Sequence, residues 1–307
     1  MHSDGRLIAL IGATGVGKTA LAIQIAQRFN GEIVGADSRQ IYRYMDIGTA
    51  KPTVTERAAA PHHLIDITDP DQPLTLAEYQ RLAYAAIAEI HGRGKLPLLV
   101  GGSGQYVTAV LEGWRTPEVP PNPALRAELE ALYAERGTAA LVERLRALDP
   151  VSAARIDPHN SRRLIRALEV CILSGEPFSA QRRKAPPLYR ILEIGLHMPR
   201  QALFPRLDAR IERMMQDGLL EEVAQLYKRG YDPRLPALSG LGYAQLGAHI
   251  RGVCSLEEAL IAFKRETRIF VRRQETWFRH HGAPEWFSAS EPSAVLARIA
   301  AWLQEET

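Results

Sequence analysis

The amino-acid sequence predicts an α/β fold, a parallel sheet covered by helices and interrupted by a helical insertion domain. Two observations predict it. Short apolar runs alternate with helix-like segments between residues 6 and 101, which is typical of parallel strands joined by crossover helices. A proline-rich segment then separates this alternation from a stretch with a purely helical pattern.

The expected elements follow in chain order. Short, mostly apolar runs at residues 6–11, 32–36 and 96–100 predict buried parallel strands. The patterns of residues 18–29 and 76–90 predict helices, each followed by a glycine that ends it. Residues 189–197 predict a returning strand, and the chain from about Leu203 onward predicts helices.

Prolines mark the insertion. Residues 116–123 hold four prolines in eight positions, which excludes a helix interior or a central strand. Residues 124–174 have a helical pattern, and a second break follows at Pro177, Pro186 and Pro187. We therefore expect residues 1–114 and 191–307 to form the α/β core and residues 115–190 to form the insertion domain.

The composition excludes several classes of protein. Of 307 residues 46% are hydrophobic, and 38 Lys and Arg face 35 Asp and Glu, so neither a disordered chain nor a uniformly basic nucleic-acid binder is indicated. Two isolated cysteines, Cys171 and Cys254, exclude a zinc ribbon and a disulfide framework, and Cys171 suits a buried apolar position. The sequence shows no signal peptide and no run of about 18 apolar residues, so we expect a cytoplasmic protein, with a monomer as the default.

The strongest local signal is a phosphate-binding loop. The pattern G-x-x-x-x-G-K-[ST] is matched between a predicted strand and a predicted helix by Gly12, Ala13, Thr14, Gly15, Val16, Gly17, Lys18 and Thr19. Backbone N–H groups and the helix N-terminus attract an anion there, Lys18 adds a positive charge, and the Thr19 hydroxyl can bind Mg²⁺. The core is therefore expected to be P-loop NTPase-like.

This loop indicates phosphate but not ATP. The strand at residues 96–100 ends in Gly101-Gly102-Ser103 and lacks the Asp that holds Mg²⁺ in nucleoside triphosphatases, and no Asn-Lys-x-Asp pattern is present. A switch GTPase is therefore disfavoured, whereas a small-molecule kinase stays open.

A carboxylate is expected beside the loop. Asp37 follows the second predicted strand, and in parallel sheets ligands bind outside the carboxyl ends of the strands. Asp37 suits a general base or a metal ligand there, but the N-cap of a following helix is an equally good interpretation from the residues alone.

Several blocks taken together resemble a known family. They are Gly12–Thr19, Asp37–Tyr42, Asp46–Pro52, His62–Asp66, Gly101–Tyr106, Asp149-Pro150, Arg162–Val170, Gly242-Tyr243 and Arg273–Arg279. In this order, from residue 7 to about residue 287, the chain resembles the bacterial tRNA dimethylallyltransferases (isopentenylpyrophosphate:tRNA transferases). The resemblance implies transfer of the dimethylallyl group from dimethylallyl diphosphate to N6 of the adenosine 3′-adjacent to the anticodon, with release of diphosphate.

The resemblance also implies residue roles. The loop would hold the donor's diphosphate, Asp37 would take the proton from N6, and Thr19, Ser103 and Arg210 would hold and orient the diphosphate. Mg²⁺ is the implied cofactor, with Thr19 as its protein ligand. The implied partner is tRNA, and the residues implied to touch it are Asp37, Ser38, Arg39, Gln40, Ser103, Arg126, Arg162, Arg163, Leu164, Ile165 and Arg166.

Two basic clusters favour an RNA partner over a small acceptor. Within residues 161–190 the basic side chains are Arg162, Arg163, Arg166, Arg182, Arg183, Lys184 and Arg190. On a helix through residues 261–281, one face is expected to be free for phosphate and holds Lys264, Arg268, Arg272 and Arg279. The opposite face is expected to pack in the core and holds Phe263, Phe270 and Trp277. Solvated charge is the alternative interpretation of both clusters.

Other interpretations stay open. An enzyme that prenylates free adenine nucleotides would share the loop and Asp37, and a P-loop kinase would share the loop. A non-enzymatic RNA-binding protein would show no turnover. The pair His62-His63 is interpreted as structural or as part of a substrate pocket, because adjacent side chains project apart and no third metal ligand has suitable spacing.

Overall fold

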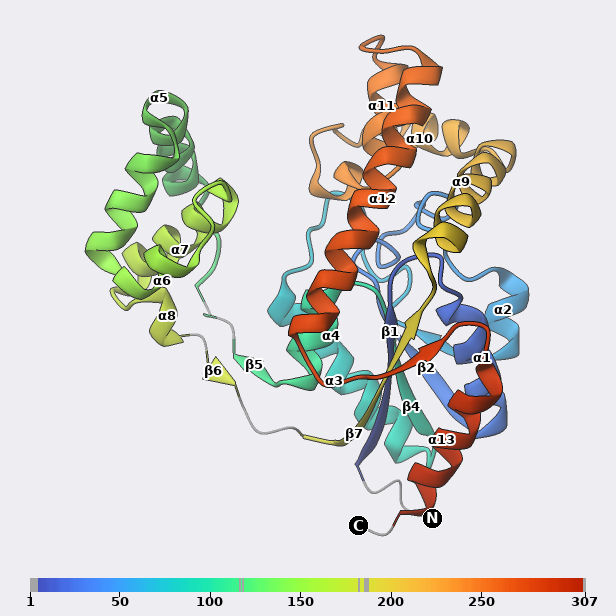
Figure 1. Ribbon diagram of the computed structural model, residues 1–307. Helices are drawn as coiled ribbons and strands as arrows, with labels where there is room; N and C mark the ends of the chain where they lie inside the picture. Colours follow the sequence, from blue (N-terminus) through green and yellow to red (C-terminus); the bar gives the residue numbers. More distant parts are fainter. Residues whose placement is uncertain (1–4, 116, 118, 182, 185–187, 306–307) are drawn as a thin grey trace. The chain divides into compact units, whose positions relative to one another are not determined.

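Figure 1 shows the computed structural model, which describes residues 5–115, 117, 119–181, 183–184 and 188–305. The chain divides into two compact units. The α/β unit takes in the chain up to Leu111 and again from Pro187, and the helical unit runs from Glu112 to Pro186. Both boundaries lie a few residues before those expected from the sequence. Some residues used in the sequence analysis lie outside the described residues: residues 116 and 118, Arg182, Pro186 and Pro187.

A six-stranded parallel sheet in the order β3-β2-β4-β1-β7-β8 forms the centre of the α/β unit. The strands are β1 (Arg6–Gly12), β2 (Gly31–Ala36), β3 (His62–His63), β4 (Leu96–Gly101), β7 (Arg190–His197) and β8 (Glu285–Ser288). The predicted α/β fold is confirmed. The edge strands β3 and β8 were not expected, because such short segments carry almost no pattern. Strand β8 therefore corrects the prediction that the chain beyond Leu203 is wholly helical.

Alternate side chains of β1 enter two separate cores, one on each face of the sheet. Leu7, Ala9 and Ile11 face the first core, whereas Ile8 and Leu10 face the second. The first core is covered mainly by α3 (Leu76–Gly92), α4 (Gly104–Leu111), α10 (Leu219–Lys228), α11 (Tyr243–Ile250) and α12 (Leu256–His280). The second is covered mainly by α1 (Lys18–Arg28), α9 (Arg200–Gln216) and α13 (Pro292–Gln304). Burial on both faces explains why the central residues of β1, β2 and β4 are almost all apolar.

Within its described residues, the helical unit is built from helices and a short strand pair. The helices are α5 (Pro123–Leu148), α6 (Pro150–Arg155), α7 (Ser161–Ser174) and α8 (Phe178–Gln181), and the strands are β5 (Trp114–Arg115) and β6 (Arg183–Lys184). The pattern of residues 124–174 thus corresponds to α5, α6 and α7, because Pro150 begins α6 and Asn160 caps α7; α5 is itself interrupted at Gly137, whose backbone is not helical (φ +71°). Cys171 is buried in this unit's core, as expected.

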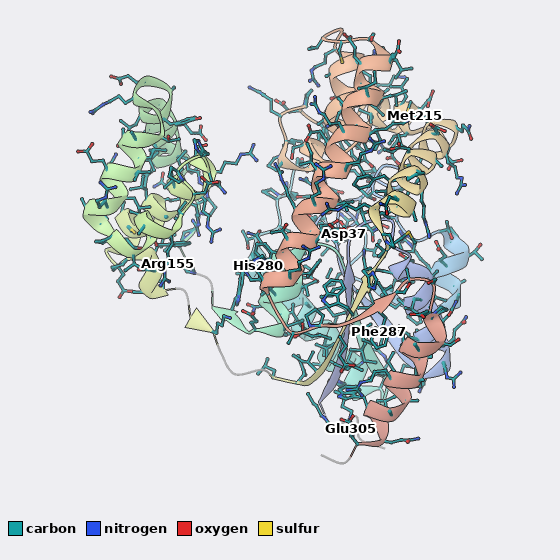
Figure 2. The ribbon with its side chains drawn as sticks, viewed as in Figure 1. Asp37, Arg155, Met215, His280, Phe287 and Glu305 are labelled. Carbon is teal, nitrogen blue, oxygen red and sulfur yellow. The ribbon has the colours of Figure 1, made fainter. Side chains whose placement is uncertain are left out.

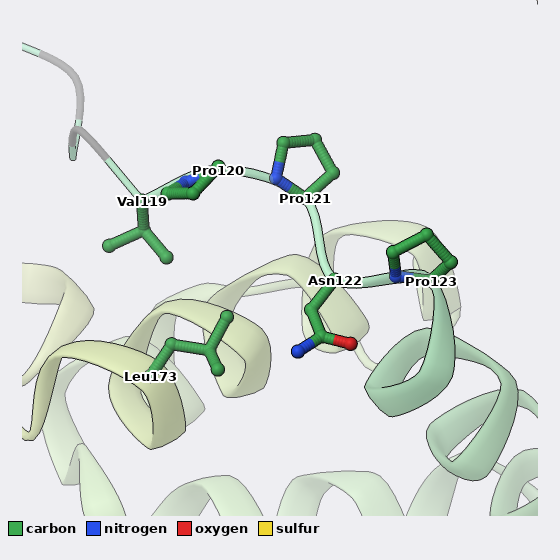
Figure 3. Close-up of a pocket in the computed structure, with 6 residues that line it drawn as sticks. All are labelled: Val119, Pro120, Pro121, Asn122, Pro123 and Leu173. Atoms are coloured by element: carbon green, nitrogen blue, oxygen red, sulfur yellow. The ribbon is translucent and has the colours of Figure 1, made fainter.

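The proline-rich segment lines a hollow on the helical unit. A pocket of about 570 Å³ lies among residues 119–123 and Leu173 of α7. Figure 3 shows Val119 and Leu173 pointing into the space between the segment and α7, whereas the ring of Pro121 points away from it. Pro123 is the first residue of α5, so the prolines end before the helix interior.

Within the described residues, no helix is long and apolar enough to cross a membrane.

Candidate active site

The phosphate-binding loop connects β1 to α1 at the carboxyl edge of the sheet. The backbone of this loop requires glycine at position 15. Gly15 has a φ of +83°, which other residues rarely adopt, and a Cβ there would lie 2.5 Å from Cδ2 of Leu207. Gly17, with φ +104°, precedes α1 and provides no side-chain cap for the first turn. The N–H groups of that turn are therefore available to an anion.

Lys18 lies inside this loop. Its Nζ donates to the carbonyl oxygens of Gly12 at 2.9 Å and Ala13 at 2.8 Å. Burial lowers the pKa of Lys18 to about 8; the negative charge of Asp37 opposes this shift and the positive charge of Arg210 adds to it. The three charges therefore act on one another across a single site.

Asp37 follows β2 at the same edge, and Figure 2 marks its place beside the ends of the central strands. Its Oδ1 accepts from the backbone N–H of Arg39 at 2.8 Å and of Gln40 at 3.4 Å. The carboxylate thus caps a turn, not a helix as in the alternative interpretation. Within the described residues, Oδ2 has no hydrogen-bond partner, so this oxygen is available to a substrate.

Ser103 connects Asp37's loop to the end of β4. Its Oγ accepts from the backbone N–H of Ser38 at 2.8 Å and donates to the Ser38 Oγ at 3.1 Å. Its own N–H donates to the carbonyl of Ala36 at 3.1 Å. Ser103 therefore fixes the residues on either side of Asp37, and its predicted contact with a diphosphate stays a prediction.

Helix α9 brings two arginines toward the loop. The charge of Asp37 acts on the guanidinium of Arg210, while burial lowers the pKa of Arg210. One turn earlier, Nη2 of Arg206 lies 3.9 Å from where a Cβ on Gly17 would be. Neither guanidinium forms a hydrogen bond or ion pair within the described residues, so both can bind an anion.

A second set of contacts fixes the segment after Asp37. The carboxylate of Glu222 on α10 accepts from the backbone N–H groups of Asp46, Ile47 and Gly48 at 2.8–3.2 Å. The Tyr243 hydroxyl also donates to Glu222, at 2.5 Å. These three backbone N–H groups lie outside any helix or strand, and the Glu222 carboxylate serves as their hydrogen-bond acceptor.

Two predicted RNA contacts use their side chains inside the protein. The Arg39 guanidinium donates to the carbonyls of Pro236 at 2.5 Å and Ala237 at 3.1 Å. The Gln40 amide donates to the carbonyls of Thr49 and Ala50, both at 3.1 Å. These donors hold the loops around Asp37, so the structure supports a positioning role for both side chains.

The predicted contacts in the helical unit divide into two groups. Leu164 and Ile165 are 0% and 7% exposed and belong to the unit's core, so their side chains are not available to RNA, and a contact through their backbone stays a prediction. Arg162 and Arg163 are exposed at the start of α7. Their charges oppose the helix dipole there, which an anionic partner would relieve.

Arg126 and Arg166 are ion-paired. Both bind the buried carboxylate of Glu169, Arg126 at 2.8 Å through Nε and Nη2 and Arg166 at 2.6 Å through Nη1. Arg190, predicted as part of the same basic cluster, lies in β7 of the α/β unit and pairs with Glu305 at 2.7 Å. The basic surface of the helical unit is therefore smaller than its sequence indicates.

The C-terminal basic face is also partly neutralised. On α12, Lys264 pairs with Glu212 at 2.9 Å and Arg268 pairs with Asp208, both partners lying on α9. Phe263 is buried as expected, but Phe270 is 36% exposed, so its prediction as a core residue is wrong. The buried residues of α12 instead follow the helical period through Phe263, Thr267, Val271, Gln274 and Phe278.

His63, one of the two adjacent histidines, has a structural role. His63 Nε2 lies 2.6 Å from the buried carboxylate of Glu32, which also binds Arg93 and Lys95. Burial opposes ionisation of Glu32, but these hydrogen bonds lower its pKa to about 2. Within the described residues, no group of three or more His, Cys, Asp or Glu side chains could hold a metal ion.

Gln274 is a site residue that the sequence analysis missed. Its Oε1 accepts from the backbone N–H of Thr14 at 2.9 Å, and its Nε2 donates to the carbonyl of Gly102 at 2.8 Å. One buried amide therefore joins the phosphate-binding loop to the end of β4. The signal available in the sequence was a polar residue on the apolar face of a long helix.

We expect Gln274→Ala to lower the free energy of unfolding by about 1–3 kcal/mol, because it leaves the partly buried N–H of Thr14 and the buried carbonyl of Gly102 without partners. Anion affinity at the loop should fall with it, since the Thr14 N–H is no longer held. Chemical denaturation and titration with diphosphate measure both effects. The exposed Gln225→Ala on α10 is the matched control, and equal behaviour of the two variants would contradict this role.

Comparison with known proteins decides the family. A sequence profile described as IPP transferase matches residues 40–281, and one described as isopentenyl transferase matches residues 5–71. The chain belongs to the IPP transferase family. A relative from Chloroflexus aggregans named tRNA dimethylallyltransferase is 59% identical, over 95% of this chain and 99% of its own length. The resemblance inferred from the sequence motifs is thereby confirmed.

Solved structures of IPP transferases have the same fold. The full-length tRNA isopentenylpyrophosphate transferase of Bacillus halodurans is 40% identical, with a TM-score of 0.73 and coverage of 98% of this chain and 97% of that chain. A eukaryotic dimethylallyltransferase described as acting on tRNA is 27% identical, with a TM-score of 0.78 and coverage of 92% and 74%.

Proposed function

We propose that this protein is a tRNA dimethylallyltransferase. It transfers the dimethylallyl group of dimethylallyl diphosphate to N6 of the adenosine 3′-adjacent to the anticodon and releases diphosphate. The observation that carries the proposal is the position of Asp37, whose negative charge acts on both Lys18 of the loop and Arg210 of α9. A general base thus lies beside an anion site, as an alkylation of an amine by a diphosphate ester requires.

The donor side of the reaction needs stabilisation of a leaving group. As the bond between the allylic carbon and the diphosphate oxygen breaks, negative charge grows on the diphosphate. In this proposal the uncapped N–H groups of the first turn of α1, Lys18 and Arg210 stabilise that charge. The allyl group spreads the complementary positive charge.

The acceptor side needs removal of a proton. The N6 amine forms a bond to the allylic carbon and passes one proton to the carboxylate of Asp37. Oδ1 of Asp37 is held by two backbone N–H groups, so Oδ2 is the oxygen available for this proton. The target base must leave its stack to reach a site at the edge of the sheet.

Magnesium fits this site only together with the substrate. Thr19 lies in the first turn of α1, and its hydroxyl has no hydrogen-bond partner within the described residues, so it could bind the ion. Mg²⁺ usually binds one or two protein oxygens plus substrate phosphates, which matches this sparse set. When bound, the ion would neutralise charge on the diphosphate.

Because one chain carries the loop, Asp37 and Arg210, we propose that a monomer acting on cytoplasmic tRNA is sufficient.

One incubation tests the function. Purified protein, unmodified tRNA, dimethylallyl diphosphate and Mg²⁺ are combined, and the nucleosides are analysed by mass. A five-carbon gain on one adenosine, abolished by a chelator, is expected. Parallel reactions with AMP as acceptor and with ATP as donor test the alternatives. Modification of AMP but not tRNA, or phosphate transfer from ATP, would contradict the proposal.

We expect donor affinity to fall as pH rises above about 8. The pKa of Lys18 is about 8 in the free protein, and a bound diphosphate raises it by stabilising the ammonium. The affinity for the donor is therefore at its maximum below that pH, and it falls by up to about tenfold per pH unit above it. Titration calorimetry with dimethylallyl diphosphate across this range measures the effect. The arginine of Lys18→Arg stays charged, so the donor affinity of this variant should change little with pH. A wild-type affinity that does not change with pH would contradict the assignment of Lys18 to diphosphate binding.

A further inference from the structure

A second pocket lies at the same edge of the sheet as the phosphate-binding loop. It has a volume of about 400 Å³ and is lined by His197, Met198, Pro199, Arg200, Glu275, Arg279 and Trp286. It borders the loop through two elements. His197 follows Leu196, the register partner of Gly12, and Glu275 follows Gln274, which binds Thr14. The pocket shares none of the residues assigned above to catalysis.

Trp286 presents a fixed aromatic surface in this pocket. It lies in the edge strand β8 opposite Gly195 of β7. A Cβ on Gly195 would lie 2.6–2.9 Å from three atoms of the six-membered ring, so the indole lies flat against bare backbone. The side chain is nevertheless 41% exposed, and it has no aromatic or cationic partner within the described residues. One face of the ring is thus held and the rest is available for stacking.

Positive charge accompanies the indole. Arg200 is held by Glu275, with Nε at 3.0 Å and Nη2 at 2.5 Å from one carboxylate oxygen. Arg279 is exposed and forms no ion pair or hydrogen bond within the described residues. The pocket therefore joins an aromatic face to one free guanidinium and carries a net positive charge.

We propose that this Trp286 pocket binds an unpaired nucleotide of the tRNA, with the base stacked on Trp286 and a phosphate bound by Arg279. The inference rests on the proposed function. An aromatic platform beside a cation is how proteins hold single-stranded RNA, whose bases have free faces. A purely apolar partner would leave Arg279 unused, and a small anion would not need the indole.

The position suits a nucleotide near the modified one. Strand β8 lies four strand spacings from β2, which Asp37 follows. At about 4.8 Å per spacing, the two sites are about 19 Å apart across the sheet. The phosphate-binding loop after β1 lies between them. An anticodon loop that places one base at Asp37 would therefore bring an unpaired nucleotide a few positions away in the loop, rather than the adjacent one, to Trp286.

The test measures tRNA affinity at a fixed salt concentration for the full-length protein and its variants. Trp286→Ala should weaken binding by about tenfold, and Trp286→Phe, which still stacks, should stay within about threefold of the wild type. Arg279→Ala should weaken binding and lower the salt dependence by about one phosphate contact. The exposed Arg265→Ala on α12, outside the pocket, is the charge-matched control and should bind like the wild type.

Kinetics separates this inference from the proposed function. KM for tRNA should rise in Trp286→Ala while KM for dimethylallyl diphosphate stays unchanged. Wild-type affinity in both Trp286→Ala and Arg279→Ala would overturn the pocket assignment and leave the proposed function standing. Equal losses in Trp286→Ala and Trp286→Phe would also overturn it. A third outcome would overturn it as well. If the wild type sediments as a dimer, and the Trp286 and Arg279 variants sediment as monomers with unchanged tRNA affinity, the pocket binds a second copy of this chain and not RNA.

Discussion

Asp37→Asn is expected to lower kcat by about 10²–10⁴-fold, the usual contribution of a positioned general base. The amide oxygen of Asn can still accept the N–H groups of Arg39 and Gln40, so the turn keeps its shape and only the proton acceptor is lost. The affinity for dimethylallyl diphosphate should change little, because the loop, Lys18 and Arg210 are untouched. Single-turnover assays with saturating tRNA and titration with the donor measure the two quantities.

The matched control is Asp71→Asn, which neutralises an exposed carboxylate elsewhere in the α/β unit. It should leave turnover unchanged. Near-normal turnover in Asp37→Asn would refute the base assignment, and a large loss of donor affinity would show that Asp37 acts through the diphosphate instead.

Glu169→Ala is expected to destabilise the helical unit by about 1–3 kcal/mol, because it leaves the Asn122 N–H and two partly exposed guanidinium groups without their buried acceptor. Glu169 is 0% exposed and binds Arg126, Arg166 and the backbone N–H of Asn122. Hydrogen exchange of the amides in α5 and α7 measures this local stability, which suits a chain of two units better than a single unfolding transition.

Acid should have a similar effect on the wild-type unit. Burial opposes the charge of Glu169, but hydrogen bonds from Arg126, Asn122 and Arg166 lower its pKa below the ordinary 4.5. The stabilisation is therefore present above that value and is lost as pH falls through the lowered pKa. Glu176→Ala, at an exposed position of the same unit, is the control for the variant. Wild-type exchange rates in Glu169→Ala would show that the network contributes nothing.

Local pattern was sufficient for the parts of the fold that depend on neighbouring residues. The buried strands β1, β2 and β4, the loop from Gly12 to Thr19 and the position of Asp37 after β2 were all predicted, because each is encoded in a continuous segment. Strand β8 could not be found this way, since four residues become a strand only by pairing with β7.

Charge was the least predictable property. The basic residues of the sequence predicted two RNA-binding faces, but many of them form ion pairs inside the protein. Arg126 and Arg166 bind Glu169. Lys264 and Arg268 bind acidic residues of α9. Three of these four pairs join residues that are far apart in the sequence, so nothing near the basic residue indicates the pairing; only Glu169, three residues after Arg166, lies near its partner. The same reason explains why Gln274, which joins two loops across the sheet, was missed.

The most direct test of the account is a crystal structure with an unreactive thiolo-diphosphate analogue of the donor and an anticodon stem-loop. The account predicts diphosphate oxygens within hydrogen-bond distance of Lys18 Nζ and the N–H groups of the first turn of α1. It also predicts N6 of the target adenine within reach of Asp37 Oδ2. Diphosphate bound away from the loop, or an adenine that cannot approach Asp37, would contradict it.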